Sequence, residues 1–344
     1  MRVLRQIIDI YQKYYYNLGV VKSDRILVAG AGGFIGGWLV RDLLNKGFTN
    51  IVAVDIKEFS NWYQIFDQTT NHVLDLRSSE NCLKAMEGVK IVYNLAADMG
   101  GMGFIEKNKA LCMLSVLINT NLIDIAKNQN VNRYFYASSA CVYNQKMQLD
   151  PRNLGLKESD AYPADPEDGY GWEKLFSERM CNHYYQDFGL EVRVGRFHNV
   201  YGPRGTFDGG REKAPAAICR KVAKAFLSGN HEIEIWGDGE QTRSFTYIED
   251  TIHGVSLMMA GRYELPLNIG SSEEVSINQL VDIVEDIAGI KLARKYLLDA
   301  PKGVRGRNSD NTLIKQIFDW EPSIKLKEGL TETYNWIFQE LSSN

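Results

Sequence analysis

The chain has 344 residues, of which 44% are hydrophobic, so it can form one large domain or two ordinary domains around a buried core. A net charge of -4, without a strongly basic stripe, argues against a nucleic acid as the main partner. Five cysteines without a C-x-x-C pair argue against a disulfide framework and against a metal site. We therefore expect a soluble, cytoplasmic protein that binds no metal.

The first 22 residues predict an amphipathic helix that precedes the main fold. Its apolar side chains recur at helical spacing, at Leu4, Ile7, Ile8, Tyr11, Tyr14, Tyr15 and Leu18. Arg2, Arg5 and Asp9 interrupt them, so a signal peptide is not expected. We interpret the helix as docked on its own domain or on a second copy, with a membrane-surface anchor as the alternative. We expect no apolar run long enough to cross a membrane, and no membrane partner.

From Arg25 onward, short runs rich in Val, Ile and Ala alternate with longer stretches of helical pattern. The runs are Ile26–Ala29, Ile51–Val54, Ile91–Leu95, Arg133–Ala137 and Glu191–Gly195. Continuous apolar runs of this length suit strands that are buried on both faces. Their alternation with helices predicts an α/β fold with a Rossmann-like, doubly wound parallel sheet, mainly over residues 23–195.

Beyond this sheet the pattern loosens into loops with three helical stretches, at Ala214–Ser228, Ile277–Ala288 and Leu326–Leu341. We interpret residues 196–344 mainly as a smaller C-terminal substrate-binding lobe, with the chain crossing between the lobes. Because no long linker separates the two parts, we expect them to pack around one cleft.

A glycine-rich segment follows the first predicted strand and opens a helix. Gly30, Gly33 and Gly36 lie where side chains would keep phosphate oxygens from the backbone at the positive helix end. Asp55 ends the next strand, where a carboxylate can bind the adenosine ribose and would repel a 2′-phosphate, which favours NAD over NADP. Asp75 could contact the adenine or cap a helix. The alternative for the segment is a structural turn. The predicted cofactor residues are Gly30, Gly33, Phe34, Ile35, Gly36, Asp55, Asp75, Tyr170 and Lys174.

Tyr170 and Lys174 are four residues apart and share one face if their segment is helical. A nearby ammonium would lower the pKa of Tyr170, so that the phenol could accept the proton of a sugar hydroxyl while hydride leaves for NAD. Ser139 follows a predicted strand and would hydrogen-bond the reacting oxygen at the carboxyl edge of the sheet. The Y-x-x-x-K pattern alone is common by chance, but its order after the glycine segment and the serine favours catalysis.

These motifs resemble the extended short-chain dehydrogenase/reductase family, in its NAD-dependent epimerase/dehydratase branch. The resemblance runs from about Arg25 to about Ile337, and within the branch it is to enzymes that epimerise GDP-mannose at carbons 3 and 5. Its most specific segments are Asn94–Phe104, Tyr136–Cys141, Gly195–Asn199, Gly209–Ala217, Trp236–Phe245 and Gly303–Asp310. The resemblance implies oxidation at sugar carbon 4, proton exchange at carbons 3 and 5, and reduction by the same bound NADH. It also implies a homodimer.

The resemblance assigns the proton exchange to Cys141 and Lys213. Related 4,6-dehydratases carry a glutamate at the position of Cys141 and related 4-epimerases a threonine, so a thiol there favours exchange at carbons 3 and 5. Without the resemblance, Cys141 would be interpreted as a small buried hydrophobic residue and Lys213 as a solvated side chain. Thiolate character requires positive charge nearby, part of which Lys213 could supply.

The resemblance also assigns the contacts to a GDP-hexose. These residues are Met99, Gly100, Ser139, Ala140, Cys141, Asn199, Glu212, Lys213, Ala214, Lys221, Gln241, Thr242, Arg243 and Arg307. Arginine suits a diphosphate because its planar guanidinium forms two parallel hydrogen bonds. Of Arg305 and Arg307 we expect one to point inward, and we favour Arg307. Two alternatives stay open: an NAD-dependent epimerase of another nucleotide sugar and, more remotely, a non-catalytic NAD-binding scaffold.

Overall fold

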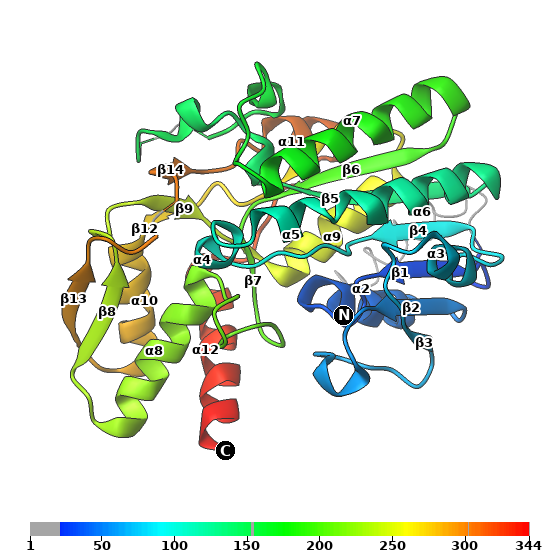
Figure 1. Cartoon of the computed structure of the whole chain (residues 1–344). Helices are drawn as coiled ribbons and strands as arrows, with labels where there is room; N and C mark the ends of the chain where they lie inside the picture. The colour runs from blue at the N-terminus through cyan, green and yellow to red at the C-terminus, as the bar shows by residue number, and fades with distance from the viewer. Residues whose placement is uncertain (1–20, 153–154, 302, 344) are drawn as a thin grey trace.

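A computed structural model of the chain describes residues 21–152, 155–301 and 303–343 (Figure 1). The helix predicted over residues 1–22 lies outside the described residues, apart from its last two positions.

A seven-stranded parallel sheet forms the centre of the larger lobe, in the order β11-β6-β5-β4-β1-β2-β3. Its strands are β1 (Ile26–Ala29), β2 (Ile51–Asp55), β3 (Thr70–Val73), β4 (Ile91–Asn94), β5 (Arg133–Ser139), β6 (Val192–Phe197) and β11 (Leu267–Ile269). Every residue of β1, β2 and β4 is buried, as continuous apolar runs require when helices cover both faces of a sheet. The predicted Rossmann-like α/β fold is confirmed.

Helices cover both faces of this sheet (Figure 1). One face carries α3 (Ser79–Ala85), α5 (Lys109–Met113), α6 (Val116–Asn128) and α7 (Tyr170–Phe188), and the other carries α2 (Phe34–Asn45) and α9 (Ile248–Ala260). Alternate residues of β1 face opposite layers. Ile26 and Val28 belong to the core cluster with Val255 of α9, whereas Leu27 packs in a second cluster with Leu122 of α6.

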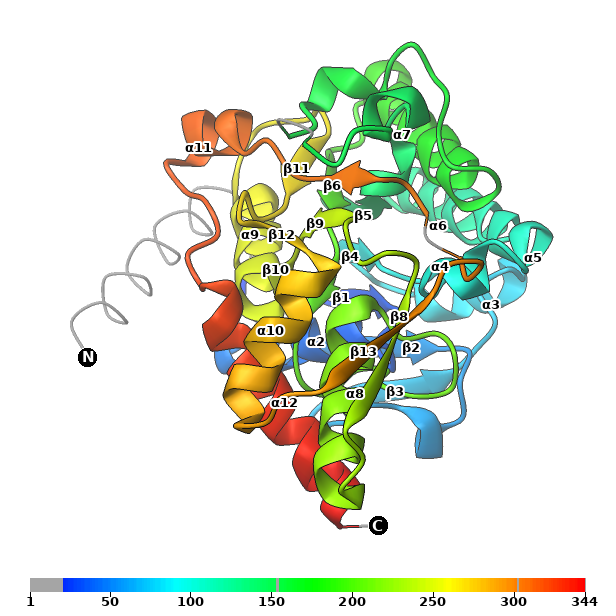
Figure 2. The ribbon, with the colours of Figure 1, turned by 90° about the vertical axis from the view of Figure 1, so that its left-hand side faces the viewer.

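The smaller lobe contains three helices that pack against one another (Figure 2): α8 (Ala214–Ser228), α10 (Ile277–Ala288) and α12 (Leu326–Ser342). The sequence predicts all three. A parallel pair, β8 (Glu232–Trp236) and β13 (Ala293–Leu297), lies beside them. A three-stranded sheet has the order β12 (Glu274–Ser276), β9 (Thr242–Ser244) and β14 (Gly306–Arg307), and it carries Arg243 on β9 and Arg307 on β14.

The chain returns to the larger lobe after entering the smaller one. The short parallel pair β7 (Val200–Tyr201) and β10 (Thr246–Tyr247) leads into α9, which packs on α2. The following strand, β11, then pairs with β6 and extends the sheet, while α11 (Thr312–Phe318) packs against β11. The boundary predicted near residue 196 therefore marks only where the chain first leaves the sheet.

One helical stretch, Lys109–Asn128 through α5 and α6, is long and apolar enough to cross a membrane, with a mean hydropathy of 1.4. The expectation that no run reaches this length is therefore wrong. The stretch packs against α3 and α7, and 39% of its apolar window is buried. Because a core helix of a sheet passes the same test of length and composition, the stretch is only a weak indication of a membrane span.

Candidate active site

The glycine-rich turn between β1 and α2 is built from backbone atoms. Gly30 has a φ of +85°, and its N–H donates to the carbonyl of Val54 at 2.7 Å. A Cβ on Gly36 would lie 2.0 Å from the carbonyl oxygen of Gly30, so only glycine allows this turn to close. Helix α2 begins after Gly33 without a side-chain cap or an acidic residue in its first turn, which leaves backbone N–H groups for an anion. This cradle fits the pyrophosphate of a dinucleotide.

The segment after β2 lies along the same turn. Asp55 is 8% exposed, and its carboxylate accepts the backbone N–H of Lys57 at 3.0 Å. The Lys57 ammonium donates to the carbonyl of Gly32 at 2.7 Å, and burial lowers its pKa. A Cβ on Gly32 would lie 2.6 Å from the ring of Trp62. Lys57 and Trp62 are therefore parts of the cradle that the sequence did not predict. The position of Lys57, two residues after Asp55, was the one feature that could have indicated it.

The side chain of Asp75 forms a local ion pair, whereas that of Phe34 packs against a loop distant in the chain. The carboxylate of Asp75 pairs with Arg77 at 2.7 Å, and this hydrogen bond lowers the pKa of Asp75. Helix α3 is capped by Ser78, whose hydroxyl accepts the backbone N–H of Asn81 at 3.5 Å, so the helix-cap interpretation of Asp75 is wrong. A Cβ on Gly205 would lie 2.8 Å from the ring of Phe34, so that ring faces the loop after β7. Phe34 and Ile35, the first two residues of α2, can offer only backbone to a phosphate.

Three predicted catalytic residues meet where β5 ends and α7 begins. Ser139 is the last residue of β5, and its hydroxyl accepts the backbone N–H of Cys141 at 3.2 Å. Tyr170 is the first residue of α7 and packs in one buried cluster with Cys141 and Ile105, against which the partly buried Met99 packs. Beside it, a Cβ on Gly171 would lie 2.3 Å from the carbonyl oxygen of Cys141. Glycine after the tyrosine therefore lets the helix start approach the thiol.

Lys174 lies near Tyr170 without lowering its pKa. The Lys174 ammonium is 5.5 Å from the centre of the Tyr170 ring and 3.5 Å from the Glu173 carboxylate. Burial, followed by the charges of Cys141 and Glu173, raises the pKa of Tyr170 well above its usual value. The predicted lowering is therefore wrong for this structure, because spacing four residues apart on a helix shows proximity but not desolvation.

A buried network surrounds the thiol of Cys141. Arg307 of β14 donates from Nη1 to Cys141 Sγ at 3.3 Å and from Nη2 to the Glu167 carboxylate at 3.1 Å. It also donates from Nε to Gln148 Oε1 at 2.6 Å. Burial raises the pKa of Cys141 to about 11; the Glu167 charge acts in the same direction, and that of Arg307 opposes it. Glu167 was not predicted, and no motif or periodicity marks it.

Lys213, the N-cap residue of α8, faces the same charges. Burial lowers the pKa of Lys213, while the charge of Cys141 raises it and that of Arg307 lowers it. Its segment is held against the glycine run before α4 (Met102–Ile105). There the Gly101 N–H donates to the Arg211 carbonyl at 3.0 Å, and a Cβ on Gly101 would lie 2.5 Å from the Glu212 carbonyl oxygen. The predicted acid thus lies in a site closed by the Met99–Gly103 segment.

A second, half-buried arginine lies beside Arg307. Arg243 of β9 is its register partner, and desolvation together with the Arg307 charge lowers the pKa of Arg243 to about 9. Two adjacent cations with little solvent around them suit an anionic or strongly polar group. Arg305, in contrast, pairs with Asp238 at 3.0 Å, with 35% of its side chain exposed. The structure therefore directs Arg307, and not Arg305, into the site.

The other predicted substrate residues lie around this centre. Asn199 donates to the Ser244 carbonyl at 3.0 Å, and Gln241 donates to that of Trp236 at 3.0 Å. The Thr242 hydroxyl donates to the Pro151 carbonyl, and the Lys221 ammonium donates to the Glu234 carbonyl at 2.7 Å. The Glu212 carboxylate pairs with Arg220 at 2.7 Å. Ala140 is buried in a short 3-10 turn, and Ala214 is the first residue of α8. Lys221 and Glu212 are thus engaged on α8 and just before it, outside the buried network.

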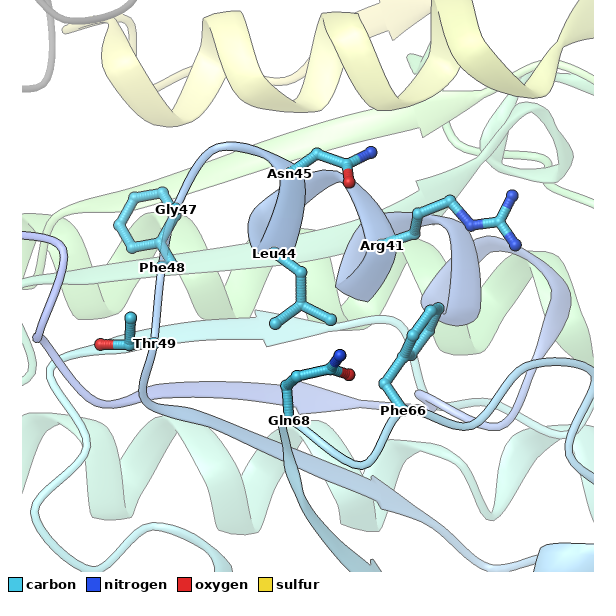
Figure 3. Close-up of a pocket in the computed structure, with 8 residues that line it drawn as sticks. All are labelled: Arg41, Leu44, Asn45, Gly47, Phe48, Thr49, Phe66 and Gln68. Atoms are coloured by element: carbon cyan, nitrogen blue, oxygen red, sulfur yellow. The ribbon is translucent and has the colours of Figure 1, made fainter.

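A hollow of about 460 Å³ lies apart from this centre, between the end of α2 and the loop before β3 (Figure 3). Arg41, Leu44, Phe48 and Phe66 are among its lining residues, and none of the predicted site residues lines it. Its residues Thr49 and Gln68 lie just before β2 and β3, at the amino ends of these strands, whereas Ser139 lies at the carboxyl end of β5.

Comparisons with known proteins agree with this arrangement. The model of the NAD dependent epimerase/dehydratase family matches residues 26–270. GDP-mannose 3,5-epimerase of Arabidopsis thaliana is 48% identical over 318 residues, covering 92% of this chain and 83% of its own length. GDP-mannose 3,5-epimerase 1 of Oryza sativa subsp. japonica is likewise 48% identical, over 92% of this chain and 82% of its own. The structure of UDP-glucose 4-epimerase of Thermotoga maritima, 23% identical, has the same fold, with a TM-score of 0.83 over 92% of this chain and 99% of that chain. This chain therefore belongs to the NAD-dependent epimerase/dehydratase family, and its cofactor is NAD.

Proposed function

We propose that this chain epimerises GDP-mannose at carbons 3 and 5, to GDP-L-galactose, GDP-L-gulose or both. The similarity to plant GDP-mannose 3,5-epimerases supports the substrate. One observation carries the chemistry: Cys141 lies close enough to Lys213 for its charge to raise the pKa of that lysine, and it lies beside the serine and tyrosine of the oxidation site. Simple epimerisation at carbon 4 needs no such acid/base pair.

The residues divide the reaction between them. NAD supplies the hydride acceptor, and later the donor, at sugar carbon 4. Tyr170 must first lose its own phenolic proton to solvent, and as a phenolate it then takes the proton from the carbon 4 hydroxyl, with Ser139 hydrogen-bonded to the same oxygen. The ketone formed on the sugar makes the protons on carbons 3 and 5 acidic. Cys141 removes such a proton from one face and Lys213 protonates the opposite face, which inverts the carbon.

The substrate side chains orient the sugar nucleotide. Arg243, which is half-buried, and Arg307, which is buried, offer two adjacent cations to its polar or anionic groups, since their backbones are paired in one sheet. The Met99–Gly103 segment holds its backbone against the segment that carries Lys213, and so fixes the position of that segment beside the sugar.

Incubation with GDP-mannose in deuterated water tests this function. We expect deuterium at carbons 3 and 5 of the recovered sugars, identified by NMR together with the products. Tyr170→Phe provides the background rate. Bound GDP-mannose without any exchange would contradict the proposal, and exchange only with another nucleotide sugar would move the assignment to that substrate.

We also infer that two copies associate through α5, α6 and α7. Met113, Leu114, Leu117, Trp172 and Phe176 are 41–55% exposed on or between these neighbouring helices, and large apolar side chains exposed together suit an interface between copies. Coverage by a second copy, in place of a membrane, accounts for the apolar stretch through α5 and α6.

The oligomeric state tests this association. Leu117→Glu combined with Phe176→Glu should convert a dimer to a monomer in analytical ultracentrifugation. The control is Leu298→Glu, since Leu298 is 59% exposed in the other lobe. A dimer that persists in the double variant contradicts the interface.

A cytoplasmic location is proposed because the five cysteines are free thiols in the part of the chain that the structure describes. Cell fractionation with an antibody to the chain tests it, and recovery in a membrane or secreted fraction would contradict it.

A further inference from the structure

A buried acid lies beside the thiol, and the proposed reaction does not yet use it. Glu167 is 8% exposed and precedes α7. Its backbone N–H donates to the carbonyl of Cys141 at 3.0 Å. Two nitrogens of one guanidinium, that of Arg307, bind the sulfur at 3.3 Å and the carboxylate at 3.1 Å. The thiol and the carboxylate are therefore held side by side.

One oxygen of Glu167 is bound and the other is not. Arg307 binds Oε2, whereas Oε1 is buried without a hydrogen-bond partner among the residues that the structure describes. Glu178 is a useful contrast, because both of its buried oxygens are bonded, by Ser138 and by Arg196. A buried acceptor without a donor costs about 1–3 kcal/mol, so its presence requires an explanation.

The chemistry of Cys141 supplies an explanation for this unpaired oxygen of Glu167. A base at this position must be a thiolate, yet burial and the Glu167 charge raise the pKa of Cys141 to about 11. At neutral pH the sulfur therefore carries a proton. That proton must leave before the sulfur can remove one from carbon.

We propose that Glu167 is the positioning residue that activates Cys141, by accepting the thiol proton on its free oxygen. The S–H bond breaks and an O–H bond forms on Glu167, while Arg307 stays charged beside the thiolate. The thiolate then takes the proton from carbon, and Lys213 gives its own proton to the opposite face. Return of the proton from Glu167 to the Lys213 amine, through solvent, restores the site without any oxidant. This inference rests on the proposed function.

Glu167→Gln tests the proton transfer, since an amide of the same size cannot accept the proton. In the wild type the proton moves internally, so the rate of deuterium exchange should change little between about pH 6 and 9. In the variant the rate at pH 7 should fall about 100-fold and should rise about tenfold per pH unit, because solvent must now remove the proton. Glu167→Asp should recover part of the flat profile. A wild-type pH profile in Glu167→Gln would overturn the proposal, whatever the overall rate.

A second measurement does not depend on the substrate. Iodoacetamide should label Cys141, which is 7% exposed, ahead of the other four cysteines, which are fully buried. We measure the labelling of Cys141 by mass spectrometry as a function of pH. The pH of half-maximal labelling should be about one pH unit or more lower in Glu167→Gln, because the negative charge is lost. An unchanged midpoint would overturn the proposal. Glu167→Gln should therefore make the thiol easier to ionise and at the same time make the enzyme slower. A simple loss of packing would not produce both effects together.

Glu178→Gln is the matched control. It removes another buried carboxylate from a guanidinium, that of Arg196, and should change neither the labelling midpoint nor the pH profile. Wild-type enzyme that binds GDP-mannose without exchange would disprove the proposed function, while the labelling midpoint would still decide whether Glu167 controls the thiol.

Discussion

The cofactor side and the substrate side of the active site consist of different chemical groups. The cofactor side is a turn of backbone groups around Gly30 and Gly36, placed by residues close together in the chain. The substrate side is a cluster of buried ionisable side chains, among them Cys141, Lys213 and Arg307, brought together from distant segments. The difference indicates that changes on the cofactor side act through shape and affinity, whereas changes on the substrate side act through protonation and rate.

Tyr170→Phe should have the largest effect if the substrate side works through protons. Without the phenol the carbon 4 hydroxyl keeps its proton, and the protons on carbons 3 and 5 are not acidic before oxidation. Exchange and epimerisation should both fall by at least about 10³-fold, measured by deuterium incorporation. The NAD content of the purified protein should stay unchanged. Exchange at the wild-type rate in this variant would contradict the proposed order of steps.

Cys141→Ser should come next, with epimerisation reduced about 10²- to 10³-fold. GDP-mannose and NAD should still bind, and oxidation at carbon 4 should still be visible as NADH absorbance. Cys219→Ala is the control, because Cys219 is fully buried within α8 and should affect stability only. Normal turnover in Cys141→Ser would return this cysteine to a packing role.

Gly36→Ala probes the cofactor side. The added methyl group would meet the carbonyl oxygen of Gly30 at 2.0 Å, so the turn must shift. NAD affinity should fall about 10- to 100-fold, measured by calorimetry on protein stripped of cofactor. The methyl group of the neighbouring Gly37→Ala would meet the side chain of Gln64 at 3.1 Å and no backbone atom of the turn, so it should leave the turn closed. Equal losses in the two variants would show that the closure of the turn is not the cause.

His198 offers the smallest effect, on stability alone. Burial lowers the pKa of His198 to about 3, whereas an unfolded histidine titrates near 6.5. Below pH 6.5 the unfolded chain binds a proton that the folded chain does not, so the free energy of unfolding should fall by about 1.4 kcal/mol per pH unit towards pH 3. His198→Asn should flatten this slope in urea denaturation between pH 7 and about 4.5. Exposed His231→Asn is the control, and an unchanged slope in His198→Asn would contradict the linkage.

The local parts of the molecule could be predicted from the sequence. Strands β1, β2 and β4 are apolar runs buried on both faces, and the turn at Gly30 is a spacing of glycines, so both are visible within a few residues. The three helices of the smaller lobe follow from their periodicity.

Features set by long-range packing could not be predicted. Strand β11 has three residues, too few for a pattern, and its place is set by β6. Glu167 meets Arg307 only in the folded chain, and no sequence spacing indicates such a pair. The pKa of Tyr170 was predicted in the wrong direction because the motif shows its neighbour but not its burial.

The return of the chain through α9 and β11 limits how members of this family can be recombined. The smaller lobe is not one exchangeable cassette, because residues 248–269 within its sequence complete the sheet that holds the cofactor. A chimera that takes everything after β6 from a relative would also replace an edge strand and the helix that packs on α2. A graft intended to change only substrate preference must therefore take two separate segments, one on each side of this return.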